Sequence, residues 1–269
     1  MLFSILNVKY KQIMKFKNLV FITLFAIGFQ LQAQTQMIAH RGFWKTEGSA
    51  QNSLASLSKA NEVKAYGSEV DIWLSSDGVP VVNHDGDVNL NGEKLIIQDT
   101  PANILTQVKL SNGENLPTFE SYLNAFEDCH DTKLIIELKS HRTKYQEDEL
   151  TEKVLKMVRD RKLQNRVEYI SFSLNFVVKT IQLDPLAYVY YLTGNLPPQS
   201  MKQIGAAGID YNLKVIKDNP QWVKESHDLG LKVNVWTVNK PEDIQEMIDL
   251  NVDFITTDEP LLVKQMLTK

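Results

Sequence analysis

The chain has 269 residues, of which 43% are hydrophobic and 23% charged, a composition that is typical of a globular protein and excludes a disordered chain. Four lysines and no acidic residue precede position 34, so the net charge of -4 becomes about -8 for the remainder, which disfavours a nucleic-acid partner. Cys129 is the single cysteine, which excludes an intrachain disulfide and a thiolate metal site.

Residues 1 to 33 have the pattern of an export signal. Lysines precede the apolar run at 19 to 29, and the small residue Ala33 follows it. The run is too short for a permanent membrane anchor. We expect removal of this segment and a periplasmic or secreted protein without a stable membrane anchor. Met1 and Met14 both remain possible starts, since Met14 opens a more typical signal.

Residues 34 to 269 contain no repeat or linker and are predicted to form one domain. Short β-rich runs alternate with helix-length segments, for example those at 53–66, 118–128, 147–160 and 241–250. This alternation favours an α/β fold, a (β/α)8 TIM barrel, over a doubly wound open sheet. The eight predicted strands are 37–40, 68–72, 134–138, 167–171, 187–192, 208–212, 232–236 and 253–256.

A hairpin is predicted directly after the second of these strands. Asp77-Gly78 forms a tight turn, and such a short connection joins only antiparallel strands. Residues 79 to 84 are therefore the return arm of a small insertion and lie outside the barrel count. This pairing places Asp71 roughly opposite His84.

Three carboxylates are predicted to point into the barrel mouth. Glu69 and Asp71 share one face of their strand, and Glu137 lies on the next strand, with Ile136 and Leu138 facing the helices. Buried carboxylates need a counter-charge. A hard divalent cation with oxygen ligands, Mg²⁺ or Ca²⁺, meets that need.

Cationic and imidazole side chains are predicted at the same end of the barrel. With a metal ion balancing the carboxylates, the positive charges of Arg41 and Lys139 are in excess, which implies an anionic ligand. His40 and His84 supply a base and an acid. Together these groups suit phosphoryl chemistry, in which cations spread the charge of the phosphate oxygens.

The ordered segments MIAHRG, QNS, SEVDIWLSSDGVPVVNHD, LPTFESYL, LIIELK, ISFS, VNVWTVN and FITTDEP resemble the glycerophosphodiester phosphodiesterase family across nearly the whole predicted domain. The resemblance implies a barrel of the phospholipase C-like phosphodiesterase type. It also implies hydrolysis of glycerophosphodiesters to sn-glycerol 3-phosphate and an alcohol, with a glycerol hydroxyl as internal nucleophile. By the same resemblance, the metal ligands are Glu69, Asp71 and Glu137, and His40 and His84 are the acid-base pair. The implied partner is this small substrate, and no protein partner is implied.

The sequence departs from the family pattern at two places. The segment Ala50-Gln51-Asn52-Ser53 stands where the family usually has Pro-Glu-Asn-Thr, which leaves metal preference and head-group selectivity open. The stretch between His84 and Pro117 is short, so we expect a small insertion and an open substrate entrance.

Several of these residues also have structural interpretations. His40 fits a buried structural histidine, Glu69 and Asp71 a solvent face, and Lys139 a strand cap. Trp236 fits the core as well as a wall for the alcohol moiety of the substrate. We expect Asn52 to cap the helix that begins near Ser53. Three further histidines are predicted to lie on the surface, namely His130, His141 and His227.

Two alternative functions remain. One is a related metal-dependent lipid phosphodiesterase, phospholipase D-like or phosphatidylinositol-cleaving, which an apolar rim at the mouth would favour. The other is a catalytically silent protein that binds phosphorylated ligands.

Overall fold

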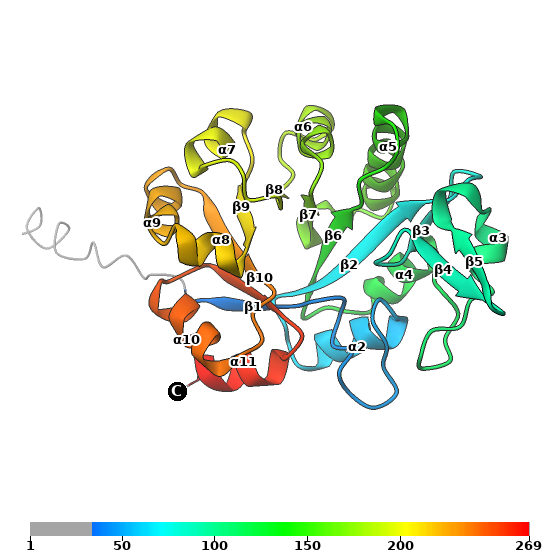
Figure 1. Cartoon of the computed structure of the whole chain (residues 1–269), viewed down its shortest axis with the longest axis horizontal. Coiled ribbons are helices and arrows are strands. Elements are labelled where there is room, and N and C mark those ends of the chain that lie inside the picture. The colour runs from blue at the N-terminus through cyan, green and yellow to red at the C-terminus, as the bar shows by residue number, and fades with distance from the viewer. Residues whose placement is uncertain (1–33, 269) are drawn as a thin grey trace, which may run out of the picture. The chain divides into compact units, whose positions relative to one another are not determined.

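Eight parallel strands close into a barrel in the computed structural model, which describes residues 34 to 268 (Figure 1). Closure follows from β1, which pairs with both β11 and β2. The predicted barrel is confirmed, and the open-sheet alternative is wrong. The predicted export signal lies outside the described residues. The barrel strands are β1 (Gln36–Ala39), β2 (Gly67–Leu74), β6 (Lys133–Leu138), β7 (Val167–Ser171), β8 (Val189–Tyr191), β9 (Gly208–Asn212), β10 (Lys232–Trp236) and β11 (Phe254–Thr257).

Helices follow the strands and surround them (Figure 1). The side chains of Ser53, Thr118 and Thr143 cap three of these helices by accepting a hydrogen bond from a backbone N–H of the first turn. Within residues 34 to 268, no helix has the length and apolar character needed to cross a membrane. The surrounding helices are α2 (Leu54–Glu62), α4 (Phe119–Glu127), α5 (Lys144–Asp160), α6 (Leu174–Leu183), α7 (Pro198–Ile204), α8 (Leu213–Asp218), α9 (Gln221–Asp228), α10 (Pro241–Asp249) and α11 (Pro260–Leu267).

The predicted hairpin is present, with a register that differs by one residue. Strand β3 (Pro80–Val82) pairs antiparallel to β2 through a turn in which Gly78 has a positive φ of 75°. Ile72 faces Val82, so Asp71 lies opposite Asn83, whose N–H donates to the Asp71 carbonyl at 3.1 Å. His84 therefore lies one residue beyond the position that faces Asp71.

The insertion after β3 is small and packs beside the hairpin. It contains β4 (Asp87–Leu90), β5 (Glu93–Ile96), the 3-10 turn η1 (Ile97–Asp99) and α3 (Ala102–Leu105), at the edge of the molecule in Figure 1. These elements bury an apolar cluster of their own with the outer side of the hairpin. The insertion therefore packs against the outside of the barrel, beside the hairpin.

Alternation along the strands separates the interior of the barrel from the layer beneath the helices. Ile136 and Leu138 belong to the main core between strands and helices, as predicted, whereas Ile135 and Ile170 fill the barrel interior. Glu69, Asp71 and Glu137 follow the interior parity, and Glu69 and Asp71 lie beyond the level at which β1 ends, since Ala39 pairs with Ser68. The fold therefore delivers these carboxylates to the mouth.

Candidate active site

Three buried carboxylates from β2 and β6 meet in the mouth of the barrel. Glu69, Asp71 and Glu137 each offer an oxygen, and these three atoms lie within 4.8 Å of one another. Asp71 and Glu137 are register partners on neighbouring strands. Glu69 Oε1 is buried and accepts no hydrogen bond from the described residues. An orphaned carboxylate oxygen in an all-oxygen cluster fits a hard divalent cation, so this trio is a candidate metal site.

The trio is electrostatically strained in the absence of a cation. Burial, together with Asp71 and Glu137, raises the pKa of Glu69 well above its ordinary value. Burial and Asp71 raise the pKa of Glu137 to about 8. Burial also acts to raise the pKa of Asp71, but Lys139 and Asn52 outweigh it and lower that pKa. One carboxylate is therefore held ionised while its two neighbours favour protons until a cation replaces them.

Lys139 and Arg41 lie beside the carboxylates, as the sequence predicts. Lys139 Nζ is 3.1 Å from Asp71 Oδ1 and 2.8 Å from Glu137 Oε1. The Arg41 backbone N–H donates to Glu69 Oε2 at 2.6 Å, and its Nε lies 3.8 Å from Asp71 Oδ2. Gly42 follows with a positive φ of 75°, and a Cβ there would lie 2.3 Å from Ser56 Oγ, so the loop needs glycine.

His40 is oriented by a residue that the sequence analysis missed. Its Nδ1 lies 2.8 Å from Asp258 Oδ1, at the carboxyl end of β11. Asp258 also accepts hydrogen bonds from Trp44 Nε1 at 3.2 Å and Asn239 Nδ2 at 2.8 Å. Burial opposes its ionisation, but His40, Asn239 and Trp44 lower the pKa of Asp258 to about 2. Its position directly after the last strand, in the segment FITTDEP, is a signal that could have identified it.

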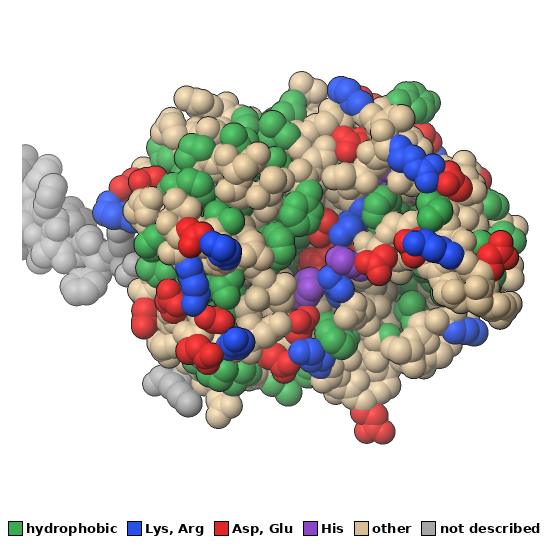
Figure 2. All heavy atoms as spheres, in the orientation of Figure 1, with side chains coloured by type: hydrophobic (Ala, Val, Ile, Leu, Met, Phe, Trp, Pro, Cys, Tyr) green, Lys and Arg blue, Asp and Glu red, His purple; other side chains and the backbone are tan. Residues whose placement is uncertain are grey.

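His84 lies on the hairpin side of the same cavity. Its Nδ1 is 2.7 Å from Asp85 Oδ1, and burial, with Lys139 and Arg41, lowers its pKa. His40, Arg41, Glu69, His84 and Glu137 all line one cavity of about 110 Å³. Figure 2 shows histidine side chains between acidic and basic ones at the centre of the face in view.

Asn52 does not cap the helix, so that prediction is wrong. Ser53 is the N-cap of α2. Asn52 is buried, has a positive φ of 59°, and its Nδ2 donates to Asp71 Oδ2 at 2.8 Å while its Oδ1 accepts from the Asp71 N–H at 3.2 Å. Asn52 therefore holds a candidate metal ligand. Gln51, where the family usually has Glu, accepts a hydrogen bond from Arg41 Nη1 at 2.7 Å.

An apolar wall completes the cavity. Trp236 packs edge-on against Phe172 with ring centroids 5.5 Å apart, and Ile170 and Leu192 line the same side. The Trp236 indole N–H donates to the Asp210 carbonyl at 3.0 Å. Trp236 is thus held by the barrel and faces the cavity, where the sequence left both possibilities open.

The surface prediction for the three remaining histidines is fully correct for one of them, and the other two are partly buried. His130 is exposed, and His227 is partly buried and pairs with Asp253 at 2.9 Å. His141 is also partly buried. Its Nε2 accepts from the Leu74 N–H at 3.0 Å and its Nδ1 lies 2.6 Å from the Lys139 carbonyl. His141 therefore joins the hairpin to the segment that carries Lys139.

A (β/α)8 barrel whose strand ends gather two imidazoles, two cations and a carboxylate trio defines the class of barrel enzymes that act on phosphate esters. Comparison with known proteins identifies the family within this class to which the chain belongs. The model of the glycerophosphoryl diester phosphodiesterase family matches residues 40–262. The chain belongs to that family and is a phosphoric diester hydrolase. The family and enzyme predictions are therefore confirmed, and the alternative of a catalytically silent binding protein is not supported.

Individual relatives agree with this assignment. A glycerophosphodiester phosphodiesterase of Caldanaerobacter subterraneus is 30% identical over 240 residues, which cover 84% of this chain and 95% of the relative. A crystal structure of a glycerophosphodiester phosphodiesterase from Parabacteroides distasonis is 45% identical, with a TM-score of 0.85 over 88% of this chain and 98% of that one. An Oleispira antarctica phosphodiesterase, solved with the product sn-glycerol-3-phosphate, shares the fold at 23% identity, with a TM-score of 0.77 over 88% of this chain and 98% of that one.

Proposed function

We propose that this protein hydrolyses glycerophosphodiesters to sn-glycerol 3-phosphate and an alcohol, with one divalent cation, Mg²⁺ or Ca²⁺. The observation that carries the proposal is that two members of the buried carboxylate trio, Glu69 and Glu137, line one cavity together with both imidazoles. The family membership and the product bound to the Oleispira antarctica relative support the substrate class.

Glu69, Asp71 and Glu137 would hold the cation. A bound divalent cation supplies positive charge that stabilises the phosphate oxygens as negative charge develops on them. Arg41 and Lys139, at the edge of the trio, add their own charges and orient the phosphate. Asn52 fixes the Asp71 carboxylate, so that ligand is in place before the substrate arrives.

His40 is the proposed base. Asp258 is ionised and accepts a hydrogen bond from Nδ1–H, which leaves Nε2 as the acceptor nitrogen. That nitrogen takes a proton from the glycerol hydroxyl next to the phosphate, and the hydroxyl oxygen attacks phosphorus. The imidazolium that results is stabilised by the Asp258 carboxylate. Intramolecular attack needs no separate positioning of a second molecule.

His84 is the proposed acid. The bond between phosphorus and the oxygen of the leaving alcohol breaks, and that oxygen receives a proton from the His84 imidazolium. Because its pKa is lowered, chiefly by burial, a protonated His84 is a stronger proton donor than a free imidazolium. Water then opens the cyclic phosphate to give sn-glycerol 3-phosphate.

A lipid phosphodiesterase remains the second candidate, because one observation favours it. Phe172, on the apolar wall, keeps 40% of its surface exposed, and Leu174 after it keeps 36%. Such a rim suits an alkyl-bearing alcohol as well as a small head group. Turnover of a lysophospholipid compared with its deacylated counterpart separates the two candidates.

The test is an assay against a panel of glycerophosphodiesters after removal of metal. We expect no turnover in excess EDTA and recovery on addition of Mg²⁺ or Ca²⁺. The variants Glu69→Ala and Asp71→Ala are expected to fold and to bind the cation more weakly, since each removes a ligand and relieves repulsion. Full turnover after exhaustive chelation would contradict the metal assignment.

We also propose that the protein is exported, on the strength of the pattern in residues 1 to 33. Mass spectrometry of the native protein is expected to find a chain that begins near Gln34 or Thr35. An intact Met1 or Met14 would contradict this.

A further inference from the structure

A second cavity lies at the opposite end of the barrel from the carboxylate trio. It has a volume of about 580 Å³. Met37, Tyr66, Lys133 and Arg166, which line it, lie at or just before the amino ends of barrel strands, whereas Glu69 and Asp71 of the trio lie beyond the carboxyl end of the neighbouring strand β1. The proposed hydrolysis uses none of these residues.

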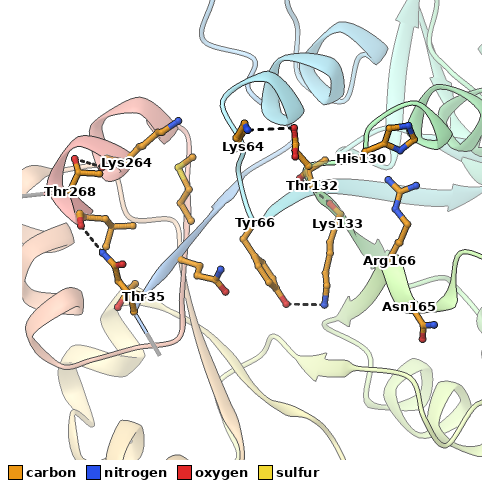
Figure 3. A pocket seen from close by; sticks show the side chains of 15 residues that line it. Thr35, Lys64, Tyr66, His130, Thr132, Lys133, Asn165, Arg166, Lys264 and Thr268 are labelled. Atoms are coloured by element: carbon orange, nitrogen blue, oxygen red, sulfur yellow. Dashed lines mark hydrogen bonds and ion pairs between the residues drawn. The ribbon is translucent and has the colours of Figure 1, made fainter. Parts of the chain in front are cut away.

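The lining of this cavity is basic, although residues 34 to 269 together carry a net charge of about -8. Figure 3 shows the side chains around it, which include four cations and one carboxylate, Asp131. The four cations are Lys64, Lys133, Arg166 and Lys264.

Two of these cations have carboxylate partners. Lys133 Nζ lies 2.7 Å from Glu168 Oε1 and 3.0 Å from the Tyr66 hydroxyl oxygen. Figure 3 marks the contact between Lys133 and Tyr66 with a dashed line. Lys64 Nζ lies 3.9 Å from Asp131 Oδ2, a long and exposed pair. These contacts offset two of the positive charges.

The other two cations have only neutral partners among the described residues. Lys264 Nζ donates to the Val63 carbonyl at 2.9 Å. Arg166 donates to the carbonyls of Phe126 and Cys129, and its guanidinium lies 4.4 Å from the centre of the Phe126 ring. A carbonyl satisfies a donor without neutralising its charge, so about two positive charges remain at this cavity.

We propose that this cavity binds a small anion with a phosphate monoester group. Such a group carries a charge of about -1.5 to -2 at pH 7, which matches the two uncompensated cations, and guanidinium recognises its oxygens well. Neutral donors suited to the remaining oxygens line the same cavity, among them Thr132 and Asn165. The group is either that of a soluble phosphate monoester or that of a lipid head group. Leu186, which is 90% exposed, lies on the α6–β8 loop at the same end of the barrel.

Binding of inorganic phosphate to the full chain by isothermal titration calorimetry tests the proposal. The catalytic cavity is itself proposed to bind a phosphate group, so the titration is carried out on Arg41→Met, which is expected to weaken that site. In this background we expect saturable binding that Lys264→Glu weakens about tenfold or more. Arg166→Met is expected to do the same. Lys264→Glu is the safer variant, because Lys264 is exposed while Arg166 also holds two carbonyls.

The matched control is Lys224→Glu on α9, which makes the same charge change at an exposed i,i+4 pair away from the cavity. It is expected to bind phosphate like its parent. Vesicles of phosphatidylcholine with and without phosphatidic acid form the second arm. Binding to phosphatidic acid vesicles that is lost in Lys264→Glu identifies a lipid head group, and binding of soluble phosphate alone identifies a soluble ligand. Equal binding by Lys264→Glu and Lys224→Glu in both arms would overturn the proposal.

Discussion

Asp258 Oδ1 lies 2.8 Å from His40 Nδ1, and the two residues are 218 positions apart in the chain. The closure of β1 against β11 brings them together. The side-chain hydrogen bonds of Asp258 go to His40, Trp44 and Asn239 and not to the carboxylate trio. Asp258 acts through His40, so it is a positioning residue, and its removal is expected to change catalysis more than substrate binding.

The variant Asp258→Asn tests this relationship. The amide has nearly the same shape, but it no longer stabilises the imidazolium and it favours the wrong tautomer of His40. We expect kcat to fall by about 10² to 10⁴, the usual worth of an acid-base group, with KM nearly unchanged. Trp44→Phe is the control, because it removes one donor to the same carboxylate and keeps the charge. A kcat equal to that of the parent in Asp258→Asn would remove Asp258 from the mechanism.

Leaving-group acidity separates the roles proposed for the two imidazoles. A more acidic alcohol needs less proton donation as it departs. His84→Ala is therefore expected to lose most activity on an alkyl head group such as choline and to retain much more on a nitrophenyl phosphodiester. His40→Ala is expected to be damaged on both substrates, because the nucleophile still needs a base. If both variants lose the same activity on both substrates, the division of roles is wrong.

Regular alternation made the carboxylate trio predictable. Glu69 and Asp71 are two residues apart on one strand, and Glu137 follows the same parity on a strand that pairs in parallel with it. Strand types and inward faces come from local patterns of this kind. The same local patterns placed His40, Arg41, His84 and Lys139 at the same end of the barrel.

Contacts made by irregular backbone were not predictable. Asn52 reaches Asp71 because it takes a left-handed conformation, with φ of 59°, just before α2, and its preference for helix caps indicated the wrong role. His141 is partly buried because the loop after β6 folds back on Leu74. The one-residue error at His84 arose because the connection between β2 and β3 has five residues, 75 to 79, and is centred on Asp77, whereas the prediction centred a two-residue turn on Asp77-Gly78. In each case tertiary contacts decided the outcome.

Two substitutions at Asn52 separate backbone strain from the contact with Asp71. Both Asn52→Gly and Asn52→Ala remove the hydrogen bond to Asp71 Oδ2. Glycine adopts the positive φ of this position without strain, whereas the same conformation costs alanine about 1 kcal/mol. We expect both variants to bind the activating cation about tenfold more weakly, since hydrogen bonds to charged groups are worth about 1.5 to 3 kcal/mol. The alanine variant is expected to melt at a lower temperature than the glycine variant. Unchanged metal affinity in both would show that Asn52 does not hold Asp71.

Asp210 is expected to make the folded state less stable as the pH rises. Its carboxyl is buried in the barrel interior, where Asn234 Nδ2 donates to Oδ1 at 2.9 Å, and burial raises its pKa from 3.8 to about 7. The folded state therefore holds this proton over a range in which the unfolded state has lost it. The contribution of Asp210 to stability is greatest below pH 3.8 and declines until pH about 7.

Denaturant unfolding between pH 4 and pH 8 measures this slope. We expect Asp210→Asn, which cannot titrate, to lose the part of the decline that Asp210 contributes. The absolute stability of the variant is not the readout, because the new amide also buries two N–H donors. Asp218→Asn, an exposed carboxylate on α8, is the control and is expected to keep the parental slope across the same range. If Asp210→Asn and the parent show parallel profiles, Asp210 is ionised in the folded protein throughout, and another buried group nearby must hold the compensating charge.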